Sequence, residues 1–394
     1  MIPYLGFMAG TRITIVGGGL GGLVAAIACA EAGREVRLLE AHEQVGGRAR
    51  ATDGPYKANL GPHVIYKDGG LWEWMGERKI LPAFARPPLS GVRFRWQGEV
   101  RRTPPLGSVL PATRLRGREA PVDQPFREWA ASHTDEQTAA MLSAAAGVYT
   151  FHHDPGELSA AFIWSHTVRV LLSPPPTARY LIGGWSALVA ALEGRARELG
   201  VAIETGSRVD ALPEPPVIIA TELPEAAALL GEELAWMAGH TVCLDLGLTH
   251  RRGDPFVVSD LDEAGWVERF SAPDPSLAPP GEELVQAQIP IRPGEDVELA
   301  AARLERLLDL SLPERRQRGT WRRRQVMEGR TGALDMPGET WRDRPAIERS
   351  DGVYLVGDMV AAPGLLSEVS WASAVRAAEL AVTAASEAAA RTTA

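Results

Sequence analysis

The feature that most constrains the fold is a glycine-rich turn near the amino terminus. Residues 13–16 (ITIV) are an apolar run typical of a buried strand. Gly17, Gly19 and Gly22 follow with the spacing G-x-G-x-x-G. In such a unit the first glycine permits a tight turn, the second lets backbone approach a pyrophosphate, and the third lets helix pack on strand. The pattern therefore predicts a βαβ unit that binds a dinucleotide.

The remaining parts of this unit follow in the required order. Residues 20–32 begin with Leu20 and place apolar side chains at helical spacing, and Gly33 is the expected stop. Residues 36–39 (VRLL) are a second strand that ends in Glu40, at about the 20-residue interval where an acid meets ribose hydroxyls. Such a carboxylate repels a 2′-phosphate, so the unit disfavours NADP.

Length, composition and charge indicate a sizeable enzyme that binds no nucleic acid. The 394 residues are 45% hydrophobic and carry a net charge of −9, which gives no electrostatic reason to bind nucleic acid or an anionic membrane surface. We expect no transmembrane segment, because no apolar run reaches about 18 residues, and no secretory signal. Cys29 and Cys243 lie in apolar segments and are expected to be reduced core thiols of a cytoplasmic protein.

The order of the predicted elements indicates two interleaved domains. Segments between 178 and 221 continue the dinucleotide-binding layers, with strands predicted over 201–203, 208–212 and 217–220. The intervening stretches differ, with proline-rich loops, many arginines and widely spaced tryptophans. We predict an α/β fold with a cofactor-binding domain (1–72, 178–240 and 346–394) and a smaller α+β substrate domain (73–177 and 241–345).

Short motifs scattered over most of the chain resemble a known superfamily. Besides the first unit they are Gly46-Gly47-Arg48, the LGPH segment with Gly61, Pro62 and His63, the YLIGG segment at 180–184, Arg208-Val209 and Gly357-Asp358. In this order they look like the FAD-dependent phytoene desaturase and flavin amine oxidase superfamily, and most like its phytoene-desaturase-like branch. The resemblance implies a Rossmann-like FAD-binding domain. FAD would be held non-covalently, because no cysteine lies near the final helix.

The resemblance implies a role for each motif. Gly46 and Gly47 would bring backbone to the pyrophosphate, and the Arg48 guanidinium would lie beside phosphate or flavin. Val209 would meet adenine through its backbone. Asp358 would accept hydrogen bonds from ribityl or ribose hydroxyls.

The final helix would then lie against the flavin ring. It is expected to begin near Glu368, Val369 and Ser370. Its N–H groups and dipole would stabilise the negative charge that collects at N1 and C2=O when flavin is reduced. A purely structural terminal helix would look the same, so this interpretation depends on the preceding Gly357-Asp358.

Two polar side chains are candidates for a catalytic role. His63 follows the Gly61-Pro62 turn, which the family places against the ring. It could donate a hydrogen bond to the flavin, shuttle a proton, or fill a core position. Tyr66 lies three residues further on and has the same alternatives. The flavin supplies the redox chemistry, so the protein mainly has to hold a substrate carbon beside N5 and exclude water.

Two other clusters are weaker candidates for sites. Residues 152–154 (HHD) are adjacent and face no second ligand cluster, so we predict no metal site. Residues 322–324 (RRR) lie in an acidic chain with only Trp321 beside them for stacking, so we predict no nucleic-acid partner. Mixed charges over 303–315 favour an exposed helical face.

Departures from the family pattern narrow the activity. No lysine follows Lys79, so the lysine that holds a water near N5 in many flavin amine oxidases has no counterpart. The chain is also shorter than typical carotenoid desaturases, which argues against a very long polyene. We interpret the protein as an FAD-dependent oxidoreductase that desaturates a largely apolar small molecule by hydride transfer to N5. The sequence is compatible with peripheral membrane contact and does not define the oligomeric state. The alternatives are a flavin amine oxidase, a flavin-dependent isomerase and a non-catalytic lipid carrier of the same fold.

Overall fold

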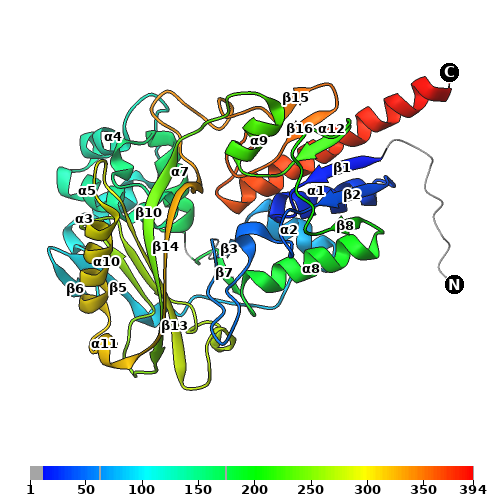
Figure 1. The fold of residues 1–394 in the computed structure, drawn as a ribbon. Coiled ribbons are helices and arrows are strands. Elements are labelled where there is room, and N and C mark those ends of the chain that lie inside the picture. Colours follow the sequence, from blue (N-terminus) through cyan, green and yellow to red (C-terminus); the bar gives the residue numbers. More distant parts are fainter. Residues whose placement is uncertain (1–11, 62–63, 174, 394) are drawn as a thin grey trace.

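The computed structural model describes residues 12–61, 64–173 and 175–393, and within these ranges the chain forms two large β-sheets with helices packed around them. The sheets occupy opposite halves of the view in Figure 1. Their strands alternate along the sequence, so the chain passes back and forth between the halves. This α/β architecture confirms the predicted fold class. The domain boundaries stay a prediction.

The first sheet contains the predicted dinucleotide-binding strands. Its order is β15 (Glu348–Ser350), β16 (Val353–Leu355), β9 (Val217–Ile219), β1 (Ile13–Val16), β2 (Val36–Leu39) and β8 (Ala202–Glu204). All neighbouring pairs are parallel except β15 with β16. Apolar side chains occupy β1 and β9 almost continuously, as expected for strands covered on both faces. Because β16 joins β9 beside β1, the two ends of the chain meet in one sheet.

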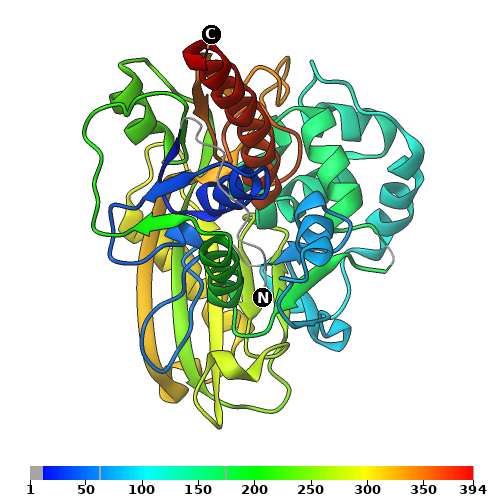
Figure 2. The ribbon, with the colours of Figure 1, turned by 90° about the vertical axis from the view of Figure 1, so that its right-hand side faces the viewer.

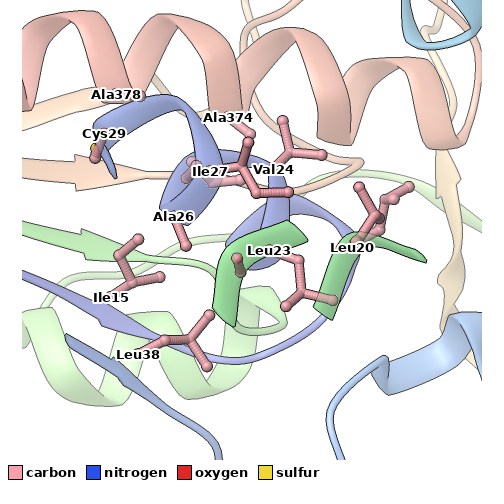
Figure 3. Packing of buried hydrophobic residues seen from close by; sticks show 14 of the residues in the cluster. Ile15, Leu20, Leu23, Val24, Ala26, Ile27, Cys29, Leu38, Ala374 and Ala378 are labelled. Carbon is pink, nitrogen blue, oxygen red and sulfur yellow. The ribbon is translucent and has the colours of Figure 1, made fainter. Parts of the chain in front are cut away.

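Helices cover both faces of this sheet (Figure 2). They are α1 (Leu20–Glu31), α2 (Gly70–Glu77), α8 (Trp185–Glu198), α9 (Leu223–Leu230) and α12 (Ser367–Thr393). Figure 3 shows α1 between the strands and α12, with Ala26 on the side of Ile15 and Ile27 on the side of Ala374 and Ala378. Alanine at the contact points lets the two helix axes approach closely, so α1 is buried along most of its length.

The second sheet is larger and mostly antiparallel. Its order is β14 (Gly319–Ala333), β10 (Ala238–Thr249), β13 (Glu282–Pro290), β12 (Trp266–Arg269), β11 (Val257–Asp260), β5 (Val92–Trp96) and β6 (Glu99–Arg101). Helix α10 (Val297–Ser311) packs Leu304, Leu307 and Leu308 against β10 and β13, and α11 (Arg315–Arg318) follows it. One face of the sheet is thus closed by α10.

A helical layer and a small sheet complete the second half. The helices are α3 (Leu106–Arg114), α4 (Phe126–His133), α5 (Glu136–Ala145), α6 (Gly147–Thr150) and α7 (Ala160–Val170). The small sheet pairs β7 (Ala178–Leu181) with β3 (Ile65–Tyr66) and β4 (Phe84–Ala85). Among the residues described, no helix combines the length and apolar composition that crossing a bilayer requires.

Two expectations about local structure are wrong. Residues 208–212 form a loop instead of a strand, because β8 ends at Glu204 and the Ser207 N–H then donates to the Glu40 carbonyl, which carries the chain across the end of β2. The 303–315 segment is not a simple exposed face, since Arg303 and Arg315 are both buried. Arg303 binds a glutamate carboxylate at 2.6 Å, so charge pairing across the fold overrides the amphipathic pattern.

Candidate functional site

A cavity of about 1230 Å³ lies between the two large sheets. One side is lined by the β1–α1 turn, the end of β2, the 207–210 loop and the end of β16. The other side is lined by strands β10 to β13 and by helices α3 and α5. Pockets for drug-sized ligands have volumes of about 300–1,000 Å³, so this cavity exceeds that range and has room for a dinucleotide and a second molecule.

The three motif glycines differ in what a side chain at each position would meet. Gly17 has a φ of +103°, and a Cβ there would lie 2.5 Å from the Ala220 carbonyl oxygen. A Cβ at Gly22 would lie only 1.9 Å from the Gly17 carbonyl oxygen, so α1 could not approach the turn. Gly19 has an ordinary φ of −70°, and a Cβ there would meet no protein atom within 4 Å. Only Gly19 therefore leaves open space, and it lines the cavity.

Most of the predicted site residues lie on the cavity wall. They are Gly17, Gly19, Leu20, Glu40, Gly47, Arg48, Gly61, Tyr66, Val209, Gly357, Asp358 and Ser370. Four others do not line it, namely Gly22, Gly46, Glu368 and Val369. Pro62 and His63 lie outside the described residues. The fold thus brings residues from both ends of the chain to one cavity.

Glu40 lies at the end of β2, directly beside the glycine turn. One carboxylate oxygen accepts the Gly18 N–H at 2.8 Å. The other accepts the His42 N–H at 2.9 Å. The His42 ring Nδ1 lies 2.8 Å from this second oxygen as well. These contacts fix the buried carboxylate at the cavity edge, and the oxygen that accepts from Gly18 keeps capacity for a further donor such as a hydroxyl.

Arg48 and Asp358 form a two-pronged ion pair, which sequence reasoning did not predict. The guanidinium Nη1 and Nη2 donate to the two carboxylate oxygens at 2.8 and 2.9 Å. Burial opposes charge on Asp358, but the Arg48 guanidinium outweighs it and lowers the pKa of the carboxyl. The pair joins the 3-10 turn after β2 to the segment after β16, so it links two stretches of the cavity wall that are far apart in sequence.

Helix α12 begins at the cavity, close to its predicted start. Ser367 and Ser370 line the wall. Glu368 points elsewhere, because its carboxylate accepts hydrogen bonds from Arg169 at 2.5 and 2.7 Å and from the Leu365 N–H at 3.2 Å. The first turn of α12 therefore presents backbone and serine groups to the cavity. The Glu368 side chain instead connects this turn to Arg169 of α7.

The opposite wall holds a buried glutamate, Glu268, that sequence reasoning missed. Glu268 is 4% exposed, accepts a hydrogen bond from the Tyr180 hydroxyl, and accepts another from Trp266 Nε1 at 2.8 Å. All three residues line the cavity, as does Tyr66. Burial raises the pKa of Glu268 to about 7, and it raises the pKa of the Tyr66 phenol well above its usual value. Tyr66 is thus a neutral hydrogen-bond donor at neutral pH.

We predict that Glu268 makes stability depend on pH. Its pKa is about 7 in the folded protein against an ordinary 4.5, so folding favours the protonated carboxyl and stability falls as pH rises between these values. Relative to Glu268→Gln, the wild-type free energy of unfolding should fall by about 3 kcal/mol between pH 4 and pH 8. Urea unfolding of both proteins at each pH measures the difference. Parallel pH profiles would contradict it.

Comparisons with known proteins agree with this geometry. Residues 15–77 match the model of an NAD(P)-binding Rossmann-like domain. A carotenoid 3,4-desaturase of Haloarcula japonica is 49% identical over 57 residues, which is 14% of this chain and only 11% of that relative's length.

Solved structures resemble nearly the whole chain. An oxidoreductase from Methanosarcina mazei superposes with a TM-score of 0.76 at 18% identity, over 94% of this chain and 100% of that one. Cyclohexylamine oxidase from Brevibacterium oxydans gives a TM-score of 0.70 at 15% identity, over 97% of this chain and 100% of that one. The chain therefore shares its overall fold with these oxidoreductase structures, and its residues 15–77 match an NAD(P)-binding Rossmann-like domain.

Proposed function

We propose that the protein is an FAD-dependent oxidoreductase that desaturates a largely apolar organic molecule by hydride transfer to flavin N5. This proposal depends mainly on the open space beside Gly19. The backbone there would accept a side chain without strain, and the space beside it is open to the cavity. A glycine at such a position is explained by a ligand that fills the space, and the motif around it belongs to dinucleotide sites.

The residues on the wall fit FAD. The turn at Gly19 and the N-terminal end of α1 would hold the pyrophosphate, with the Glu40 carboxylate accepting from the ribose. The 207–210 loop with Val209 would meet the adenine. Asp358, already oriented by Arg48, would accept from ribityl hydroxyls. The first turn of α12 would lie near the ring, where its N–H groups favour negative charge.

Non-covalent binding is part of the proposal. Cys29 and Cys243 are both buried and free. Cys243 lines the cavity, but burial raises the pKa of its thiol far above the usual range, so the reactive thiolate is disfavoured. Attachment of a flavin through this sulfur is therefore not expected.

The cavity walls support a mainly apolar substrate. The apolar residues that line the cavity include Met141, Leu142, Val148, Phe151, Phe256 and Val257. Tyr66, as a neutral phenol, would orient the substrate or the flavin by donating a hydrogen bond and would not act as a base. His63 stays a prediction, as does peripheral membrane contact; exposed Leu106 and Leu110 on α3, whose Val109 lines the cavity, support the latter.

The experiment is reconstitution with FAD followed by desalting. We expect about one flavin per chain by visible absorbance, and bleaching of that absorbance under anaerobic conditions with a substrate. Lack of retained flavin would overturn the proposal and leave a lipid carrier. Peroxide release with amines would replace the desaturase assignment with an amine oxidase, and turnover without bleaching would indicate an isomerase.

A further inference from the structure

Buried carboxylates in this protein are usually paired with arginine. Within the described ranges six of them follow this rule, namely Asp245 with Arg323, Asp254 with Arg318, Asp260 with Arg95, Glu283 with Arg269, Asp335 with Arg344 and Glu368 with Arg169. The rule has a physical cause, since burying an unpaired charge costs several kcal/mol. The buried carboxylates outside it are Glu40, Asp274 and Glu268.

Two of these exceptions have evident roles. Glu40 accepts backbone N–H groups at the edge of the predicted ribose site. Asp274 accepts the Gly183 N–H at 2.7 Å and the Ser276 N–H at 3.1 Å, so it caps the short 3-10 helix that follows it. Glu268 makes no comparable backbone contact, and no ion pair among the described residues includes it.

The surroundings of Glu268 hold its carboxylate toward the cavity. It lies on β12, in the interior of the seven-stranded sheet, and Trp266 is two residues before it on the same face of the strand. Trp266 and Tyr180 each donate to a different carboxylate oxygen. A carboxylate has about four acceptor positions, so capacity for a further donor remains.

The residues next to Glu268 on the cavity wall offer a bound molecule few other hydrogen-bond acceptors. Val257 and Gln286 are the cross-strand neighbours of Glu268 and also line the cavity. The Gln286 amide is already engaged, since its Nε2 donates to Asp245 and to the Asn59 carbonyl. Val257 has an apolar side chain and the Gln286 amide is occupied. Of these three residues, Glu268 is therefore the one that keeps a strong hydrogen-bond acceptor for a bound molecule.

We propose that Glu268, held in place by Tyr180 and Trp266, anchors a hydrogen-bond-donating group, a hydroxyl or a protonated amine, on an otherwise apolar substrate. This inference rests on the proposed function, because it specifies the substrate class of the same cavity. A donor group at one end would take the remaining acceptor positions of the carboxylate, and an ammonium would also compensate its charge. The apolar body would then extend along the adjacent walls, with its orientation fixed at one end.

The test compares three probes of matched size, benzylamine, benzyl alcohol and toluene. Binding to the FAD-reconstituted protein is measured by calorimetry, with tryptophan fluorescence as a second readout. We expect Glu268→Gln to weaken at least one donor-bearing probe by about tenfold or more and to change toluene affinity less than about twofold. Loss confined to benzylamine assigns an ammonium, and loss that includes benzyl alcohol assigns a hydroxyl.

Two further variants keep the test decisive. Tyr180→Phe retains the carboxylate but removes one of its donors, so it should weaken the same probe by a smaller factor. Glu99→Gln, an exposed carboxylate on β6 of the same sheet, should change nothing. Equal weakening of all three probes, or no effect of Glu268→Gln, would overturn the proposal. Retained flavin is read separately by absorbance, so failure of the anchor and failure of the flavoenzyme assignment are distinguishable.

Discussion

Replacing Gly19 with tryptophan is expected to weaken FAD binding by more than about 100-fold while the protein still folds. The backbone at Gly19 suits any residue, with φ at −70°, and its Cβ would project into open space. The indole would therefore clash with no protein atom near the backbone but would occupy the volume beside the pyrophosphate-binding turn. Absorbance after desalting reports FAD retention, and circular dichroism with thermal unfolding reports the fold.

Gly194 offers a matched control for this substitution. It is an exposed residue of α8, a Cβ there would also meet no protein atom within 4 Å, and it does not line the cavity. Gly194→Trp should keep both flavin and stability. If Gly19→Trp retains FAD as wild type does, the glycine turn does not bind the cofactor. If it fails to fold, the space beside Gly19 is not available as the structure describes it.

The part of the cofactor site within residues 13–40 was predictable because its elements are close together in the sequence. A strand, a glycine turn, a helix and a second strand follow one another within residues 13–40, and each leaves a pattern that sequence reveals. The structure has β1, α1 and β2 where these patterns predict them. Propensity and tertiary packing agree there, since α1 is buried between the sheet and α12.

The parts that were missed depend on contacts across the fold. Arg48 and Asp358 were each predicted to touch a cofactor, but their mutual ion pair spans 310 positions and depends on how the fold brings the segment after β16 to the turn after β2. Residues 208–212 were predicted to form a strand, yet they pair with none of the described strands and run as a loop after β8. Local pattern cannot reveal either result, because both depend on which elements become neighbours.

Glu268 shows the same limit at the substrate wall. Its segment, residues 266–269 (WVER), has no alternation of apolar and polar side chains that would indicate which face of a strand is buried. The strand lies in the middle of the sheet, and the Tyr180 hydroxyl reaches the carboxylate from the small sheet. Only the burial of that face by residues distant in sequence turns an ordinary acidic residue into a candidate anchor.

Gly22→Val is expected to lower the free energy of unfolding by at least about 4 kcal/mol. Even a first side-chain carbon would lie 1.9 Å from the Gly17 carbonyl oxygen and 3.4 Å from the Ala220 side chain. The nearest atom belongs to backbone, so relief requires α1 to move away from β1. That movement would open the core that α1 forms with the sheet and α12. Urea unfolding followed by circular dichroism measures the loss.

Gly194→Val separates this steric effect from helix propensity. Valine is a slightly better helix former than glycine, so at the open position in α8 the change should be neutral or stabilising by less than about 1 kcal/mol. A loss at Gly22 with none at Gly194 would assign the third motif glycine to helix–strand packing. Since Gly19→Trp should spare the fold and Gly22→Val should break it, the pair tests whether one short motif serves the ligand through one glycine and the architecture through another. Similar behaviour of the two variants would contradict that division.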